Sequence, residues 1–124
     1  MLDVTALKRV ARIGSLATAK ELSPNLHLTK DTPPTILFYG TDDSLLVHGK
    51  TYIENAETLG FEAVLYTADK ARHGFFNRDP WMNKTLCLSD LFLIEHGYLQ
   101  GIPELTGTEK TIMSKIHANP RKTD

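Results

Sequence analysis

The chain has 124 residues and a formal net charge of −1, with 41% hydrophobic and 23% charged residues. These values are typical of one soluble globular domain, and the lack of excess positive charge argues against nucleic acid as a partner. No apolar run approaches the roughly 18 residues that a membrane-spanning helix needs, so we expect no membrane partner.

Residues 1–32 are predicted to form a helical segment and an irregular approach to the rest of the chain. Apolar residues recur at helical spacing from Val4 to Ile13, and a second short helix is expected to end before Ser23 and Pro24. Basic residues interrupt the apolar region that a secretory signal would require, so we expect no targeting segment. A single cysteine, Cys87, excludes an internal disulfide. The compartment stays undetermined, with the cytoplasm slightly favoured.

The next segment is predicted to form a strand, a helix and a second strand. Thr35 to Tyr39 is a continuous apolar run, as expected of a parallel strand buried on both faces. A helix from about Leu46 to Leu59 has one apolar face, and Gly60 stands where a left-handed cap would end it. Phe61 to Tyr66 is the next expected strand, which would run parallel to the first.

The last predicted element is a helix followed by a polar tail. Asp79 and Pro80 indicate a helix start, and the helix should run to about His96. Its second half is apolar on most sides, so we expect it to pack across a sheet. Residues 102–124 are polar and lack a clear period, apart from a possible turn of helix over 110–116, and we expect a tail that needs a partner surface or stays mobile.

Two parallel strands with flanking helices leave an incomplete sheet. Parallel sheets are ordinarily covered on both faces and have about five strands. The strand from Thr35 to Tyr39 would therefore keep an unsatisfied apolar edge. We expect either self-association or pairing with a missing portion of the sheet.

Asp43 and His73 are the strongest candidates for chemistry. Each falls in a loop that follows a predicted strand, and the loops at the carboxyl ends of parallel strands are where catalytic groups gather. Alone, such an aspartate is often a turn or helix cap and such a histidine is often solvated. Together, a carboxylate that accepts a bond from one imidazole nitrogen would leave the other nitrogen as a general base.

The order of elements and two motifs carry a resemblance to a known family. Over residues 20–101 an apolar strand leads into G-T-D-D, then a helix, a strand, H-G-F-F-N and a last helix ending F-L-I-E-H-G-Y-L. This resembles the C-terminal third of an α/β-hydrolase, in the esterase and prolyl-oligopeptidase-like branch that includes relatives of acetylxylan esterase. The resemblance implies an α/β fold with a partial domain over 33–101, a β-α-β-α core, Asp43 as the acid and His73 as the base.

The nucleophile of that family is not apparent. In α/β-hydrolases the serine lies in a G-x-S-x-G turn between a strand and a helix, and that motif does not occur in this chain. We expect none of the five serines to lie in such a strand-turn-helix context, and the glycine-rich oxyanion loop is also missing. The serines are Ser15, Ser23, Ser44, Ser89 and Ser114.

Other candidates are weaker. Cys87 lies in the apolar part of the last helix and is expected to be an inert packing group. The histidines show no ligand spacing, so we expect neither a metal nor another cofactor. Phe75, Phe76 and Trp81 would line an acyl pocket or, more commonly for aromatic residues beside a helix, belong to the core.

The leading interpretation is the acid-and-base portion of a serine hydrolase that acts on small carboxyl esters, with a nucleophile from outside this chain. Within enzymes, the alternative is a portion of a prolyl-oligopeptidase-like peptidase. Outside enzymes, it is a noncatalytic interaction module or a truncated, inactive fragment. The sequence does not identify the substrate, because segments absent from this chain mostly build the pockets of this fold.

Overall fold

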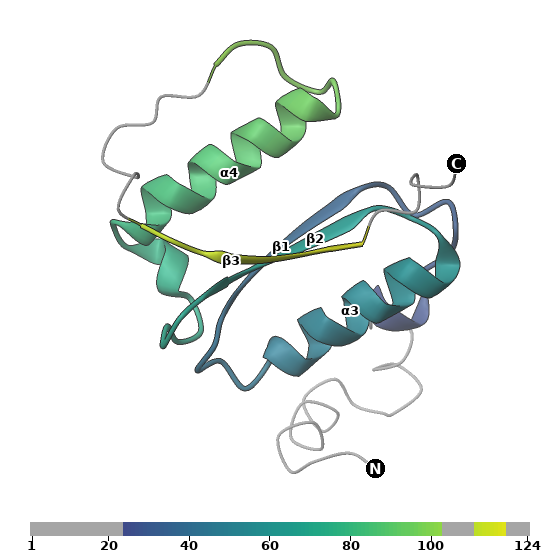
Figure 1. The fold of residues 1–124 in the computed structure, drawn as a ribbon, viewed down its shortest axis with the longest axis horizontal. Coiled ribbons are helices and arrows are strands. Elements are labelled where there is room, and N and C mark those ends of the chain that lie inside the picture. The colour runs from purple at the N-terminus through teal and green to yellow at the C-terminus, as the bar shows by residue number, and fades with distance from the viewer. Residues whose placement is uncertain (1–23, 103–110, 119–124) are drawn as a thin grey trace, which may run out of the picture.

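The computed structural model describes residues 24–102 and 111–118, which form a three-stranded sheet with a helix on either side (Figure 1). The short helices predicted before Ser23 lie outside the described residues. A 3-10 turn, η1 (Pro24–Leu26), leads into the first strand through the irregular, proline-rich segment that the sequence predicts. No helix within the described ranges is long and apolar enough to cross a membrane.

The predicted strand-helix-strand unit is present as β1 (Thr35–Gly40), α3 (Leu46–Leu59) and β2 (Ala63–Ala68). The bounds of α3 are as predicted, and Gly60 ends it with φ 88°, in the left-handed conformation that glycine adopts readily. β2 starts two residues later than expected. Phe61 is 3% exposed and is buried in the core before the strand begins, so its apolar character reflects packing in the turn.

The core lies between α3 and the sheet. Leu65 of β2 is fully buried, and Ile53 and Ala56 pack on it from the buried face of α3. Gly49 lets the helix come close to β1, because a Cβ there would lie 2.6 Å from the ring of Tyr39. The α3 layer therefore rests directly on the strand that leads into the Gly-Thr-Asp-Asp turn.

A third strand, β3 (Ser114–Ala118), corrects the prediction of a helical turn over 110–116. It pairs antiparallel with β2, with Ala63 opposite Ala118 and Thr67 opposite Ser114. The sheet is therefore mixed, in the order β1-β2-β3. Within the described residues β1 pairs with β2 alone.

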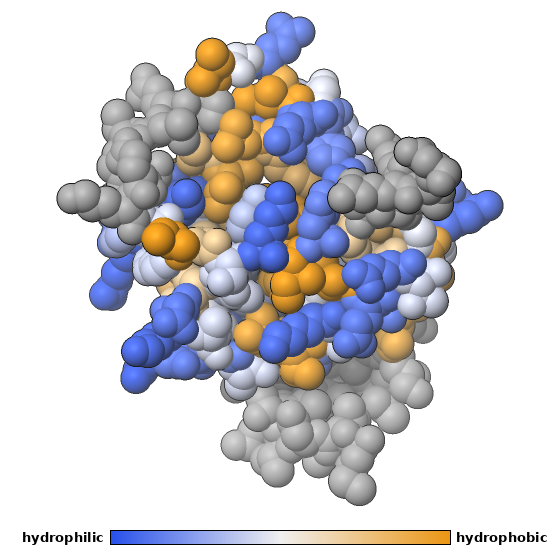
Figure 2. Space-filling view, viewed as in Figure 1, coloured by the Kyte–Doolittle hydropathy of each residue, from blue (hydrophilic) through white to orange (hydrophobic). Residues whose placement is uncertain are grey.

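The last helix, α4 (Trp81–Glu95), follows a second 3-10 turn, η2 (Phe75–Asn77). Asp79 and Pro80 lie just before the helix, but Pro80 and not Asp79 takes the cap position, so the predicted cap is one residue too early; Oδ1 of Asp79 accepts a hydrogen bond from the backbone N–H of Asn83 at 3.1 Å. Only Thr85 and Cys87 of α4 are buried, and Leu86 is 56% exposed. We expected the apolar second half of this helix to pack across a sheet. That expectation is wrong for much of the surface of α4, which is exposed (Figure 2).

Glu62 joins α4 and β3 to the start of β2. Its Oε2 lies 2.8 Å from Nε2 of His96 at the end of α4, and its Oε1 lies 3.1 Å from Nε2 of His117 in β3. The bond from Glu62 raises the pKa of His96, helped by a bond to the carbonyl of Phe92. Burial opposes ionisation of Glu62, but the bonds from both histidines outweigh it and lower the pKa of Glu62.

These shifts predict a stability maximum in mildly acidic solution. The contribution of His96 is complete below its ordinary pKa of 6.5 and is lost as the pH rises through its raised folded-state pKa. The contribution of Glu62 is complete above its ordinary pKa of 4.5 and is lost as the pH falls through its lowered folded-state pKa. The free energy of unfolding, measured by urea denaturation across pH, should therefore be greatest between these two values.

The matched variants are Glu62→Gln and Glu57→Gln, since Glu57 is an exposed residue of α3. Glu62→Gln should flatten the pH dependence and lower the stability at the maximum by about 1–3 kcal/mol, because hydrogen bonds to a charged group are lost. Glu57→Gln should leave the pH dependence and the free energy of unfolding at the maximum unchanged. A wild-type curve with no fall above the maximum would contradict the assignment.

Candidate active site

The candidate site lies where β1 and β2 end side by side. The two strands are parallel and in register from Thr35 opposite Ala63 to Gly40 opposite Ala68. The turn after β1 carries Asp43, and the loop after β2 carries His73. The parallel register thus brings two residues that are 30 positions apart in the sequence to the same edge of the sheet.

Backbone hydrogen bonds hold this turn and this loop together. The N–H of Thr41 donates to the carbonyl of Ala68 at 2.9 Å, and the N–H of Asp42 donates to the carbonyl of Ala71 at 2.9 Å. The hydroxyl of Thr41 accepts a bond from the N–H of Lys70 at 2.7 Å. Three bonds therefore join the acid-bearing turn to the histidine-bearing loop before any catalytic side chain is considered.

Gly40 is required for this close approach. A Cβ at this position would overlap the carbonyl oxygen of Ala71, the atom that accepts the bond from Asp42. Any larger residue would have to push the histidine loop away from the turn. The Gly-Thr pair before the aspartates thus has a direct physical role, glycine for proximity and threonine for a side-chain acceptor.

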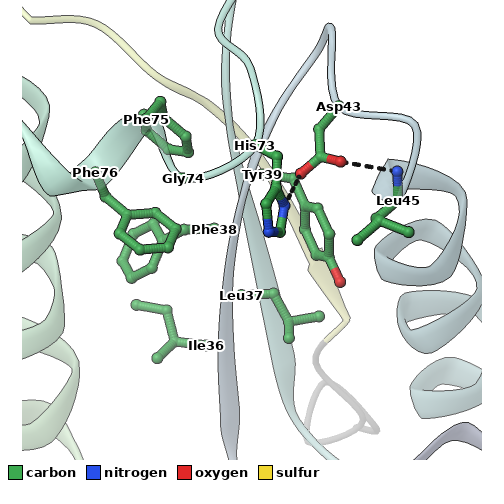
Figure 3. Close-up of a pocket in the computed structure, with 10 residues that line it drawn as sticks. All are labelled: Ile36, Leu37, Phe38, Tyr39, Asp43, Leu45, His73, Gly74, Phe75 and Phe76. Atoms are coloured by element: carbon green, nitrogen blue, oxygen red, sulfur yellow. Dashed lines mark hydrogen bonds and ion pairs between the residues drawn. The ribbon is translucent and has the colours of Figure 1, made fainter. Parts of the chain in front are cut away.

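Both carboxylate oxygens of Asp43 have partners (Figure 3). The residue is buried, with 8% of its surface exposed; Oδ1 accepts a bond from the N–H of Leu45 at 2.9 Å, and Oδ2 lies 2.9 Å from Nδ1 of His73. The side chain of His73 is 73% exposed. A fixed, buried acceptor is therefore paired with an imidazole that faces solvent.

The pairing defines the tautomer of the neutral imidazole. A carboxylate can only accept hydrogen bonds, so Nδ1 of His73 carries the proton and Nε2 holds the lone pair. An imidazole oriented in this way can accept a proton at Nε2 while Asp43 stabilises the positive charge that forms. The arrangement can act as a general base at a reactant placed beside Nε2.

A cavity of about 330 Å³ opens beside this pair. Its walls come from consecutive residues of β1, the acid turn, the histidine loop and η2, and most are apolar. The lining residues are Ile36, Leu37, Phe38, Tyr39, Asp43, Leu45, His73, Gly74, Phe75 and Phe76. A small apolar group could occupy it next to the imidazole.

The tyrosine in this wall is unsuited to be a base. Burial raises the pKa of Tyr39, and the negative charge of Asp43 raises it further. Its hydroxyl therefore stays protonated at neutral pH, and it points away from His73 in the view of Figure 3. We assign Tyr39 to packing against α3.

The remaining sequence candidates are distributed unevenly around the site. Phe75 and Phe76 line the cavity, whereas Trp81 contacts Phe75 edge to face with 5.5 Å between ring centroids and is not part of the wall. Cys87 is buried in α4. Within residues 24–102 and 111–118, no group of three His, Cys, Asp or Glu side chains is placed to hold a metal ion.

Ser44 is the serine nearest to the candidate site in the described sequence. It lies between β1 and α3, directly after Asp43, and therefore does occupy a strand-turn-helix connection. The G-x-S-x-G glycines are absent around it, and among the described residues no hydrogen bond joins its hydroxyl to His73. Ser89 donates to the carbonyl of Thr85 inside α4, and Ser114 begins β3.

A search of solved structures gives one informative relative. An esterase from the Planctomycetes species Thermogutta terrifontis, Est2, solved with propionate bound, is 30% identical over 81% of this chain with a TM-score of 0.67. The match spans 38% of the esterase's own chain. No protein-family model and no curated protein match. The likeness indicates an esterase-like fold with α/β character.

Gly40→Ala is expected to separate the acid turn from the histidine loop. Overpacking of this kind costs about 1–3 kcal/mol of unfolding free energy, which urea denaturation would measure. The NMR signal of the proton on Nδ1 of His73 should be lost as well. Gly60→Ala is the control, because Gly60 has φ 88° and open space around it, so it should lower stability and keep that signal. Retention of the signal in Gly40→Ala would refute the role of Gly40.

A second pair of variants tests the side-chain bond itself. Asp43→Asn should abolish the strong preference of His73 for a proton on Nδ1, because an amide can donate as well as accept. Asp42→Asn removes the neighbouring exposed carboxylate and should leave the tautomer unchanged. Nitrogen-15 chemical shifts of the imidazole report the tautomer directly. Equal effects of the two substitutions would show that general charge, and not the bond to Asp43, orients the ring.

Proposed function

We propose that this chain is the acid-and-base portion of a serine hydrolase that acts on carboxyl esters. The observation that carries the proposal is the bond from His73 to the buried Asp43 beside an apolar cavity. The likeness to an esterase supports the same reading. The chain spans well under half of that esterase, so the activity belongs to a complete enzyme of which these residues would form one part.

In the complete enzyme, Asp43 would hold the imidazole while Nε2 of His73 takes the proton from a serine hydroxyl. The serine oxygen would attack the ester carbonyl carbon, and the protonated Nε2 would return its proton to the departing alcohol. Water would then be activated by the same nitrogen to release the acid. Phe75 and Phe76 would contact the acyl group in the cavity.

The proposal includes the source of the nucleophile and the place of the strands. β1 and β2 would be the last two parallel strands of a longer α/β-hydrolase sheet, within a partial domain over 33–101. The serine and the oxyanion donors would come from polypeptide outside this chain. A short acyl group is favoured for the substrate, because the cavity is small and the related esterase was solved with propionate.

The noncatalytic module stays a second candidate. Its specific support is that Ser44, the one described serine in a strand-turn-helix connection, lacks the glycines of a nucleophile turn and has no described bond to His73. A peptidase of the prolyl-oligopeptidase-like branch would use the same acid and base, so these residues do not separate it from an esterase.

The test is a chimera in which residues 24–118 of this chain replace the matching part of the Thermogutta esterase. Hydrolysis of p-nitrophenyl acetate is expected, and His73→Ala or Asp43→Asn in the chimera should lower kcat/KM by about 10³–10⁴-fold, the size of effect seen when a triad member is removed. Asp42→Asn should change it little.

The chain by itself supplies the control. It should not hydrolyse p-nitrophenyl acetate faster than its own His73→Ala variant, because under this proposal the nucleophile comes from polypeptide outside this chain. Turnover that Ser44→Ala abolishes would instead identify Ser44 as a nucleophile and overturn the assignment of the serine to another segment. A folded chimera in which His73→Ala leaves the rate of hydrolysis unchanged would favour the noncatalytic module.

A further inference from the structure

The imidazole of His96 lies between two hydrogen-bond acceptors. Its Nδ1 is 2.8 Å from the carbonyl oxygen of Phe92, one turn back in α4, and its Nε2 is 2.8 Å from Oε2 of Glu62, just before β2. A backbone carbonyl can only accept a hydrogen bond, and so can a carboxylate. A neutral imidazole has a single N–H and can satisfy only one of these acceptors. The two distances together therefore require a ring with a proton on each nitrogen.

Glu62 is the negatively charged partner in this arrangement. Its Oε1 lies 3.1 Å from Nε2 of His117, so each carboxylate oxygen faces an imidazole nitrogen. Burial disfavours the charged form of Glu62, but the bonds from His96 and His117 lower its pKa overall. A neutral His117 can donate from Nε2, so the arrangement needs one additional proton. His96 is the residue that carries it.

The surroundings of His96 also favour a positive charge. The residue caps the C-terminus of α4, where the helix dipole stabilises cations, and its ring lies 4.3 Å from the ring of Phe92 between centroids, within the range of a cation–π contact. The bond from Glu62 raises the pKa of His96, the bond to Phe92 raises it further, and the charge of Glu95 adds to both. Burial opposes the charge, since only 13% of the side chain is exposed, but the other effects outweigh it.

The bond between His96 and Glu62 ties a loosely packed helix end to the sheet. The backbone of Glu62 belongs to the sheet side, because its carbonyl accepts a bond from the N–H of Thr35 at 3.1 Å. The buried residues of α4, Thr85 and Cys87, both lie in its first half, and no residue over 88–95 is buried. The position of the C-terminal half of α4 therefore depends strongly on this one polar contact.

We propose that the doubly protonated ring of His96 is a pH-sensitive tie that holds the C-terminal end of α4 against the sheet, and that loss of one proton releases this end while the rest of the chain stays folded. A neutral ring would direct a lone pair at one of the two acceptors, so it cannot keep its bridging position. The tie is complete below the ordinary pKa of 6.5 and is lost as the pH rises through the raised folded-state pKa.

The charged groups that act on this imidazole are few among the described residues. Glu62 and Glu95 are the two carboxylates that act on it directly, and His117 reaches it through Glu62. Glu62 precedes β2, whereas the pair of Asp43 and His73 follows the ends of the parallel strands. The tie and the candidate active site thus lie at opposite ends of β2, and the inference does not rest on the proposed function.

Nitrogen-15 chemical shifts of the imidazole test the protonation state. At pH 6.5, the ordinary pKa, both ring nitrogens of His96 should give the shifts of protonated nitrogen, because each faces an acceptor. The ring should become neutral only with a midpoint above that pH. A neutral His96 at pH 6.5 in the folded chain would overturn the assignment.

Amide hydrogen exchange, expressed as protection factors to remove the intrinsic effect of pH, tests the release. When the pH rises from 6.5 to above the titration of His96, protection at Gly97 and Tyr98 should fall by about tenfold or more, because a hydrogen bond to a charged group is lost. Exchange at these two amides should be insensitive to low concentrations of urea, which marks a local opening, whereas exchange at Ile53 in the core should respond to urea.

The matched variants are His96→Gln and His48→Gln, since His48 is an exposed histidine of α3. His96→Gln removes the titrating ring, so protection at Gly97 and Tyr98 should be low at both pH values, whereas His48→Gln should behave as the wild type. Far-UV circular dichroism checks that each variant is folded. The proposal would be overturned by wild-type protection in folded His96→Gln, by protection that is unchanged when His96 loses its proton, or by a fall that occurs only with urea-dependent unfolding of the core.

Discussion

The parallel pairing of β1 with β2 is the constraint on which the site depends. Because Gly40 lies opposite Ala68, the two strands end at the same level, and the turn after β1 lies next to the loop after β2. α3 makes this register possible by returning the chain to the start of the sheet, with Gly49 allowing a close fit to Tyr39. A slip by one residue would turn every side chain of β1 to the other face and separate the loops.

Backbone hydrogen bonds are the second feature that fixes the geometry of the site. Bonds from Thr41 and Asp42 to the histidine loop set the distance across which Asp43 reaches His73. These backbone bonds need not rearrange when the imidazole gains or loses a proton. Preorganised groups of this kind favour proton transfer. The exposed imidazole of His73 is therefore fixed at Nδ1 by its bond to Asp43, and Nε2 is the ring nitrogen available to a reactant.

Local signals in the sequence predicted part of this fold. The helix over 46–59 was predictable because an apolar face and Gly60 mark it, and the pairing of Asp43 with His73 followed from their places after two strands. β3 was not predictable from residues 114–118, four of which are exposed. Its pairing with β2 and the bond of His117 to Glu62 are tertiary contacts, which no local pattern records.

The same distinction explains why α4 was misjudged. Its apolar composition predicts a covered helix, yet coverage depends on which neighbours are present, and the described residues supply few. The uncovered surface of α4 and the edge of β1 that faces away from β2 share one feature, namely that the described elements present more apolar surface than they cover among themselves. The acid and base are nonetheless ordered, because the backbone bonds between their turn and loop extend from the β1-β2 pair alone and need neither a covered face of α4 nor a second neighbour for β1.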